Sequence, residues 1–397
     1  MNTHIEQSII EGLAIQRAAY HKNPVPNYAD RIRDLTRLGD FLRENKDAIC
    51  ETVNLDFGNR SMHETILSEI LPTLNEINHV KKHLKTWMKP QRRGVDLKTF
   101  IGAKNRVIPQ PLGVVGVIVP WNFPVFLSLG PLVSIFAAGN RAMVKMSENS
   151  RHLTQLIQDR MPAYFHNDKL EFIEGAEGAG QAFSKQPFDY LLFTGSGQTG
   201  SAVMAAAAAN LCPVTLELGG KSPAVVLDDY DINVAAERIL YAKCLNAGQI
   251  CVTADHVYVP QDKVDAFVQI AQSVVQKRYV SKDSPDYTSI IDDKSYARLI
   301  NALEQARAQG ATLIPLLDGE PFDAGTRKIA PHLVLNAPAD CELMTREIFG
   351  PILPIIAFTD VAHVVREINA RPRPLAFYPF THDADKLDYL LTHVMSG

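Results

Sequence analysis

The stretch YLLFTGSGQTG at residues 190–200 decides the expected fold. The apolar run YLLF leads into glycines spaced as G-x-G-x-x-G, and the alanine-rich run SAVMAAAAAN follows at once. This order predicts a strand, a tight turn and a helix, in which glycines let backbone amides approach a pyrophosphate at the helix N-terminus. A tight turn without a ligand would give the same pattern, so a dinucleotide site is one of two interpretations.

Apolar runs of strand length alternate with helical segments on both sides of this turn. Residues 1–90 indicate helices, and residues 95–118 indicate short β-like runs. The alternation predicts a parallel α/β sheet, followed by a second α/β block after Gly219-Gly220. We therefore expect domains at 1–218 and 219–397. The expected elements are strands at 142–145, 170–173, 190–193, 214–218, 224–227, 256–259 and 312–314, and a helix at 264–276.

Composition favours a soluble enzyme over a nucleic-acid or membrane protein. The chain has 397 residues, of which 46% are hydrophobic and 21% charged, and its net charge is −4 without long blocks of either sign. No run of uncharged apolar residues predicts a signal or a membrane span, so we expect a cytoplasmic protein. The cysteines are scattered and lack metal-ligand spacing, which predicts reduced thiols and no metal site. They are Cys50, Cys212, Cys244, Cys251 and Cys341.

A thiol and a carboxylate stand in loops where they can form a catalytic pair. Cys251 lies in NAGQICVTA, whose small residues permit close approach, and Glu217 lies in LELGGKSP at the end of an expected strand. Such residues can act as nucleophile and general base. A buried, inert cysteine is the alternative for Cys251. Glu217 also lies near the position where a dinucleotide fingerprint places its ribose-binding acid.

Three further loops carry polar candidates. Asn122 lies in PWNFP directly after the apolar run VVGVIV, where its amide could donate to an oxyanion or satisfy the loop backbone. Lys145 and Glu148 follow the strand AMVK, and Glu347 opens EIFGP. Taken alone, charged residues after strands are usually solvated.

In chain order, PWNFP, VKMSE, FTGS followed by Gly200, LELGGKSP, GQIC and EIFGP resemble the aldehyde dehydrogenase superfamily. The spacing of Glu217 and Cys251 also resembles that of the family. The segments GPILPIIAF and RPRPLAFY, with the short span from Asn122 to AAGN at 137–140, most resemble the branch of class 3 enzymes and coniferyl aldehyde dehydrogenase. The resemblance implies an α/β fold with a Rossmann-type NAD(P)-binding domain, an α/β catalytic domain, and a small β oligomerisation element at about 93–111.

The resemblance also implies the roles of individual residues in oxidising an aldehyde to an acid. Cys251 would form a thiohemiacetal and then a thioester, Asn122 and the Cys251 amide would stabilise the oxyanion, and Glu217 would activate water. The cofactor-binding residues would be Lys145, Glu148, Gly195, Ser196, Gly200, Trp121, Leu218, Glu347 and Phe349. The substrate pocket, for aromatic or medium- to long-chain aldehydes, would be lined by Phe123, Phe126, Leu127, Ile250 and Val252.

Several features differ from the family pattern. Met146, Gly197 and Arg346 depart from it near the cofactor residues, so NAD is expected through Glu148 and NADP is the alternative. The chain stops at THVMSG, where family members continue with a substrate loop and an interface strand. If those are absent, the expected homodimer would be weak because segment 93–111 loses a strand partner. The alternatives to an aldehyde dehydrogenase are an acyl-CoA or acyl-phosphate reductase of this superfamily and a non-catalytic relative.

Overall fold

The computed structural model describes residues 3–397 and divides into two compact units. Unit 1 comprises residues 1–53 and 65–217, and unit 2 comprises residues 54–64 and 218–397. Segment 54–64 thus packs with unit 2, although it lies within the domain expected at 1–218. Within the described residues, no helix has both the length and the apolar character needed to cross a membrane.

Unit 1 is built on a five-stranded parallel sheet in the order β5-β4-β3-β6-β7. The central strand is buried along its whole length, as expected for a parallel strand covered on both faces. The predicted parallel sheet is confirmed. The strands are β3 (Val114–Ile118), β4 (Arg141–Lys145), β5 (Leu170–Ile173), β6 (Tyr190–Thr194) and β7 (Val214–Glu217).

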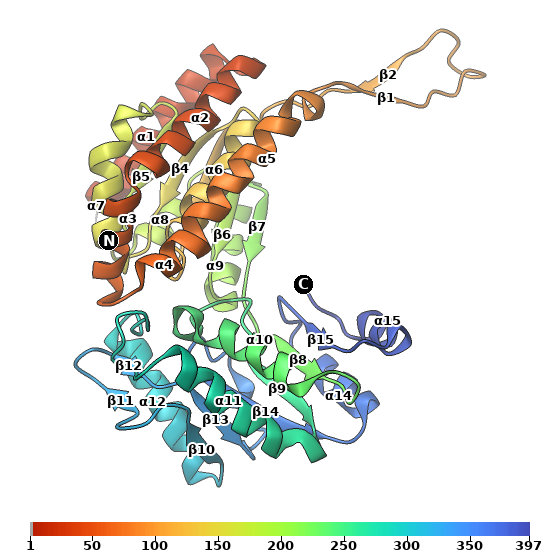
Figure 1. The fold of residues 1–397 in the computed structure, drawn as a ribbon. Coiled ribbons are helices and arrows are strands. Elements are labelled where there is room, and N and C mark those ends of the chain that lie inside the picture. Colours follow the sequence, from red (N-terminus) through yellow and green to blue (C-terminus); the bar gives the residue numbers. More distant parts are fainter. Residues whose placement is uncertain (1–2) are drawn as a thin grey trace. The chain divides into compact units, whose positions relative to one another are not determined.

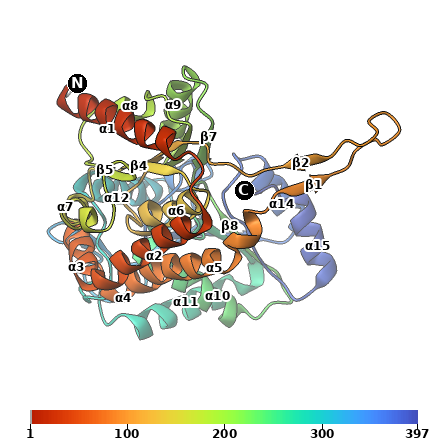
Figure 2. The same ribbon diagram turned by 90° about the horizontal axis from the view of Figure 1, so that it is seen from above.

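Helices cover both faces of this sheet (Figure 2). On one face α2, α5 and α6 pack together, and α6 contacts β3 and β4. On the other face α1 and α8 contact β4, and α9 contacts β6. This doubly wound arrangement confirms the Rossmann-type fold. The helices of unit 1 are α1 (Thr3–Lys22), α2 (Tyr28–Glu44), α3 (Lys46–Phe57), the π-helical η1 (Ile66–Ile70), α5 (Leu71–Trp87), α6 (Phe126–Ala137), α7 (Arg151–Arg160), η2 (Met161–Ala163), α8 (Ala179–Ser184) and α9 (Gly197–Ala208). The end of α3 and most of the short α4 (Met62–Thr65) lie in segment 54–64 and so belong to unit 2.

A two-stranded arm extends from unit 1. Strand β1 (Gln91–Arg93) pairs antiparallel with β2 (Asn105–Val107), and the hairpin projects away from the rest of the unit (Figure 1). Its apolar side chains are exposed, including Ile101 at 90%. The arm coincides with the segment expected to serve oligomerisation.

Unit 2 contains a six-stranded sheet in the order β10-β13-β14-β9-β8-β15, parallel except for the pairing of β10 with β13. Alternate residues of β8 and β9 pack against α10 and α11 on one face and against α14 and α15 on the other. The strands are β8 (Pro223–Val226), β9 (His256–Pro260), β10 (Thr312–Pro315), β11 (Phe322–Asp323), β12 (Lys328–Ile329), β13 (His332–Leu335), β14 (Ile352–Phe358) and β15 (Tyr378–Phe380). The helices are α10 (Ile232–Cys244), η3 (Leu245–Gly248), η4 (Gln261–Lys263), α11 (Val264–Arg278), α12 (Asp293–Ala308), α13 (Glu342–Thr345), α14 (Val361–Asn369) and α15 (Ala384–His393).

Candidate active site

In unit 1 the predicted site residues gather at the carboxyl edge of the sheet. Asn122 follows β3, Lys145 ends β4, Gly195 follows β6 and Glu217 ends β7. Because these strands are parallel, their carboxyl ends meet at one edge. In the sheet, β3 is flanked by β4 and β6, so the chain order reverses direction at β3. Such a topological switch point is where open α/β sheets usually bind ligands.

The glycine-rich turn after β6 leads into an exposed helix N-terminus. Ser196 is the N-cap of α9, and its Oγ accepts a hydrogen bond of 3.3 Å from the Thr199 amide. Residues 196–199 are exposed, and a Cβ on Gly197 would meet no atom within 4 Å. The open helix N-terminus therefore leaves room for an anion beside its amides. Gly195 donates its amide to the Glu217 carbonyl at 3.0 Å, which holds the turn against β7.

Lys145 and Glu148 lie together at the end of β4. The Lys145 Nζ donates to Glu148 Oε1 at 2.9 Å, and Lys145 is buried while the Glu148 side chain is half exposed. The loop is tightly packed, because a Cβ on Gly175 would lie 2.3 Å from the Glu148 backbone nitrogen. A buried ammonium paired with an accessible carboxylate offers hydrogen-bonding groups to a sugar hydroxyl.

The Asn122 loop is anchored by Glu69, a residue that the sequence did not single out. Glu69 lies in the π-helical η1 and is fully buried. Its Oε2 accepts from the amides of Val125 at 2.7 Å and Phe126 at 3.0 Å, where α6 begins. The carboxylate satisfies amides that a helix N-terminus leaves open, and so fixes the direction of the chain after Asn122. Asn122 itself is buried, and Phe123 is partly exposed.

In unit 2 the predicted residues lie at the opposite end of their strands. Leu218 precedes β8, Cys251 precedes β9, and Glu347 and Phe349 precede β14. Since β8, β9 and β14 are parallel neighbours, these residues gather at the amino edge of the sheet. This edge is not the one that α/β sheets ordinarily use for ligands.

Accessibility singles out Cys251 among the cysteines. Cys50, Cys212, Cys244 and Cys341 are buried, whereas Cys251 is partly exposed. Burial raises the pKa of the Cys244 thiol to about 12, so this neighbour stays protonated near neutral pH. The interpretation of Cys251 as an inert core cysteine therefore loses its main support.

The EIFGP loop is held by a buried ion pair that the sequence did not reveal. Lys221 pairs with Asp255 and donates to the Leu343 carbonyl at 2.8 Å, while Asp255 Oδ1 accepts from the Ile348 amide at 2.8 Å. Burial alone would raise the pKa of Asp255, but the Lys221 ammonium holds it below its usual range. Burial raises the pKa of the adjacent Glu347 to about 7. The pair thereby places Glu347 in a partly desolvated position.

Tyr378 is a second unpredicted neighbour of the thiol loop. It begins β15, and its hydroxyl donates to the carbonyl of Val252. Ile250 is partly exposed and Val252 is 44% exposed. The hydrogen bond ties the residue after Cys251 to the sheet.

The sequence matches the aldehyde dehydrogenase family over residues 11–397. The chain belongs to that family. A probable coniferyl aldehyde dehydrogenase of Pseudomonas aeruginosa is 46% identical over 385 residues, which cover 97% of this chain and 80% of the relative. The coniferyl aldehyde dehydrogenase of a Pseudomonas species is 42% identical, with coverages of 96% and 79%. The AldH protein of Staphylococcus aureus in its substrate-bound state is 32% identical with a TM-score of 0.92, covering 97% of this chain and 83% of its own.

Membership of the aldehyde dehydrogenase family establishes the activity as NAD(P)-dependent oxidation of an aldehyde. The resemblance to the coniferyl aldehyde dehydrogenase branch is confirmed. The interpretation as an enzyme is confirmed with it. The roles of the individual residues and the identity of the aldehyde remain predictions.

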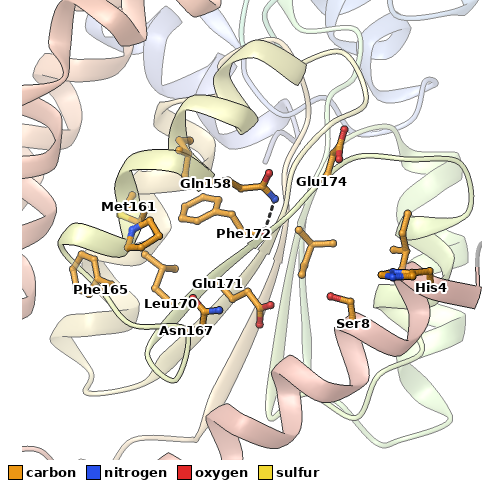
Figure 3. Close-up of a pocket in the computed structure, with 14 residues that line it drawn as sticks. His4, Ser8, Gln158, Met161, Phe165, Asn167, Leu170, Glu171, Phe172 and Glu174 are labelled. Carbon is orange, nitrogen blue, oxygen red and sulfur yellow. Dashed lines mark hydrogen bonds between the residues drawn. The ribbon is translucent and has the colours of Figure 1, made fainter.

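A cavity elsewhere in unit 1 contains none of the predicted site residues (Figure 3). It has a volume of about 420 Å³ and lies between α1, α7 and β5. Glu171 of β5 lines it, and its Oε2 atom is buried without a hydrogen-bond partner in the structure. Burial raises the pKa of Glu171 to about 7. The side chain therefore carries its proton to a higher pH in the folded than in the unfolded chain.

Replacing Glu171 with glutamine should stabilise the protein increasingly as pH rises. The Glu171 carboxyl ionises near pH 4.5 in the unfolded chain and near pH 7 in the folded chain. Its cost to the free energy of folding therefore grows between these two pH values and stays constant above pH 7. Glutamine removes the penalty. We expect the Tm of E171Q minus that of wild type to be larger at pH 8 than at pH 5. The exposed Glu174, replaced in the same way, is the control, and an equal difference at both pH values for E171Q would contradict the prediction.

Proposed function

We propose that Cys251 is the nucleophile, Glu217 the general base and Asn122 an oxyanion donor in this oxidation. The proposal rests on the accessibility of Cys251 at the amino edge of the unit 2 sheet, where the predicted residues Leu218 and Glu347 also lie. The placement of Asn122 and Glu217 at one edge of the unit 1 sheet supports it.

The chain's own groups account for every step except the acceptance of the hydride. The Cys251 thiolate attacks the aldehyde carbon, and the carbonyl electrons move to oxygen. The Asn122 amide and the Cys251 backbone N–H donate to that oxyanion, worth about 3–4 kcal/mol for one such donor by analogy with acyl transfer. After hydride leaves the carbon, an acyl thioester remains on sulfur. Glu217 takes a proton from water, which attacks the thioester, and the carboxylic acid leaves with Cys251 again a thiolate.

Bound NAD(P) supplies the nicotinamide ring that accepts the hydride. The residues that would hold its phosphates are Ser196 and the first amides of α9, with Gly195 and Gly200 giving the close approach. Lys145 and Glu148 would hold a ribose, and Trp121, Leu218, Glu347 and Phe349 would contact the rest of the cofactor. We infer a preference for NAD, because the Glu148 carboxylate can bond ribose hydroxyls and repels a 2′-phosphate.

Replacing Glu148 with glutamine should relax this preference. The amide keeps the size of the side chain but removes the negative charge, and Lys145 loses its ionic partner at 2.9 Å. We expect kcat/KM with NADP to rise about fivefold to tenfold, since a partly exposed charge contact is worth about 1 kcal/mol. Asp159→Asn, at the far end of α7, is the control. An unchanged ratio of kcat/KM for the two cofactors would refute the role of Glu148.

We infer that the substrate is an aromatic aldehyde of the coniferyl type. Three relatives are named coniferyl aldehyde dehydrogenase, two of them as probable, and the residues beside Asn122 and Cys251 are apolar. They are Phe123, Phe126, Leu127, Ile250 and Val252.

A substrate panel tests this function directly. Burial of an aromatic ring should make kcat/KM for coniferyl aldehyde exceed that for acetaldehyde on the order of 100-fold or more. Medium-chain aliphatic aldehydes, each run with NAD and with NADP, complete the panel. Comparable kcat/KM for acetaldehyde and the aromatic substrates would exclude the proposed class.

We propose that the β1–β2 arm joins two copies into a homodimer. An arm carrying Leu97, Phe100 and Ile101 at 64%, 61% and 90% exposure presents apolar surface that a partner would cover. We expect Ile101→Asp to shift sedimentation from dimer toward monomer, while Lys104→Asp on the same arm does so less. Equal sedimentation of wild type and Ile101→Asp would contradict the arm's role.

A further inference from the structure

The turn that precedes Cys251 has an uncommon backbone conformation. Asn246, Ala247 and Gly248 have φ values of 51°, 48° and 71°, which is three consecutive residues in the left-handed region. Only glycine adopts this region without steric cost, and runs of such residues are rare. A turn of this kind persists only where its surroundings determine it.

Glu64 makes one of the contacts that hold this turn. This buried residue belongs to segment 54–64, far from the turn in sequence but in the same unit. Its Oε1 accepts from the Asn246 backbone amide at 3.0 Å, at the first residue of the turn. Its Oε2 accepts from the Thr288 hydroxyl at 2.6 Å, and the Arg60 Nε lies 3.9 Å away. Both carboxylate oxygens are therefore engaged, which fixes where the Asn246 amide points.

Gln249 closes the turn from the other side. Its side chain is fully buried, donates to the carbonyls of Asn246 at 3.0 Å and Ser289 at 3.1 Å, and accepts from the Ile291 amide at 3.0 Å. Gly248 packs so closely that a Cβ there would lie 2.3 Å from the Gly350 carbonyl oxygen. The turn is thus confined between segment 54–64, segment 288–291 and the EIFGP loop.

Segment 54–64 is itself anchored independently of Glu64. Asn59 donates to the Tyr287 carbonyl at 2.8 Å, and the Ser61 hydroxyl donates to Asp286 at 2.9 Å. These bonds fasten the segment without touching the turn. The Glu64 side chain, in contrast, reaches the turn at Asn246.

We propose that Glu64 is a positioning residue for the nucleophile: by accepting the Asn246 amide it holds the left-handed turn and thereby sets the position of Cys251. The inference rests on the proposed role of Cys251. A nucleophile must lie within a narrow range of the carbonyl carbon, and a displacement of about 1 Å can cost on the order of 100-fold in rate.

The test compares Glu64→Leu, Glu64→Gln and Ser61→Ala. Leucine fills the site without an acceptor, whereas the glutamine amide oxygen can still accept from Asn246. We expect kcat of E64L to fall on the order of 100-fold and that of E64Q less than about tenfold, with KM for NAD within about twofold in both. Ser61→Ala removes an anchor that does not touch the turn and should leave kcat unchanged.

Two further readouts separate positioning from a loss of stability. The rate of Cys251 alkylation by iodoacetamide, followed by peptide mass spectrometry, should change at least about fivefold in E64L. Adding Ala247→Gly to E64L should recover part of kcat, because glycine adopts the left-handed turn without the acceptor. If E64L does not fold, Thr288→Val, which frees one Glu64 oxygen, should lower kcat about tenfold.

The proposal would be overturned if folded E64L kept the wild-type kcat and the wild-type alkylation rate, even with a lower Tm. If E64L does not fold, the same result in folded T288V would overturn it. A lower kcat in E64L with unchanged alkylation and no recovery by A247G would also overturn it. Failure of the underlying site assignment has a different signature, because Cys251→Ala would then retain activity.

Discussion

Cys251→Ala should lower the rate of aldehyde oxidation by at least about 10⁴-fold, because alanine has no nucleophile and the other four cysteines are buried. Cofactor affinity should be nearly unchanged, since Cys251 is not among the proposed cofactor-binding residues. Steady-state NADH formation and cofactor titration by fluorescence measure the two quantities.

The control for this variant is Cys244→Ala, which removes the thiol that ends α10. Its sulfur is buried, and burial raises its pKa to about 12, so it should contribute nothing to attack. We expect kcat within a few-fold of wild type. Retained activity in Cys251→Ala, or loss of activity in both variants to the same degree, would contradict the assignment.

Glu217→Gln should separate the two halves of the reaction. The amide cannot take a proton from water, so the thioester should form at a near-normal rate and hydrolyse about 10² to 10⁴ times more slowly. Stopped-flow absorbance should show a burst approaching one equivalent of NADH per active site, followed by a slow steady state. Glu174→Gln, which follows β5 at the same edge of the sheet, should behave as wild type.

The same experiment distinguishes the general base that the family resemblance implies for Glu217 from the ribose-binding acid that the dinucleotide fingerprint alone would suggest. If Glu217 held the adenine ribose, the glutamine variant would raise KM for NAD and show no burst-phase change. An unaltered steady state together with an unaltered KM would exclude both roles.

The parallel sheet of unit 1 could be predicted because each of its strands is marked by a short stretch of neighbouring residues in the sequence. The expected strands 142–145, 170–173 and 190–193 lie within β4, β5 and β6, and the glycine-rich turn does connect a strand to a helix. Buried parallel strands are short apolar runs, and glycines punctuate them. The clustering of Asn122 and Glu217 at the carboxyl edge then follows from parallel pairing.

The supports of the site could not be predicted in the same way. Glu64 reaches Asn246 and Lys221 reaches Leu343 across more than a hundred positions of sequence. A buried acid in a helix looks the same in sequence as a solvated one, so Glu69 gave no signal before its contacts with Val125 and Phe126 were known. These contacts depend on tertiary packing and not on local propensity.

The placement of Cys251 shows a second limit. Topological reasoning expects ligands at the carboxyl ends of parallel strands, and the predicted cofactor residues Lys145 and Gly195 of unit 1 lie at such ends. In unit 2 the thiol and Glu347 precede β9 and β14, so the rule alone would have favoured other loops. The motif GQIC, and not strand topology, singled out this loop, in which Cys251 is partly exposed.

Mass spectrometry of a trapped reaction tests the covalent mechanism most directly. Glu217→Gln enzyme would be mixed with NAD and coniferyl aldehyde, quenched in acid within the burst phase, digested and analysed by peptide. We predict one acyl group per chain on the peptide that contains Cys251, with none on the peptides of the other four cysteines. An acyl group on another residue, or NADH formed without any adduct on Cys251, would contradict the mechanism.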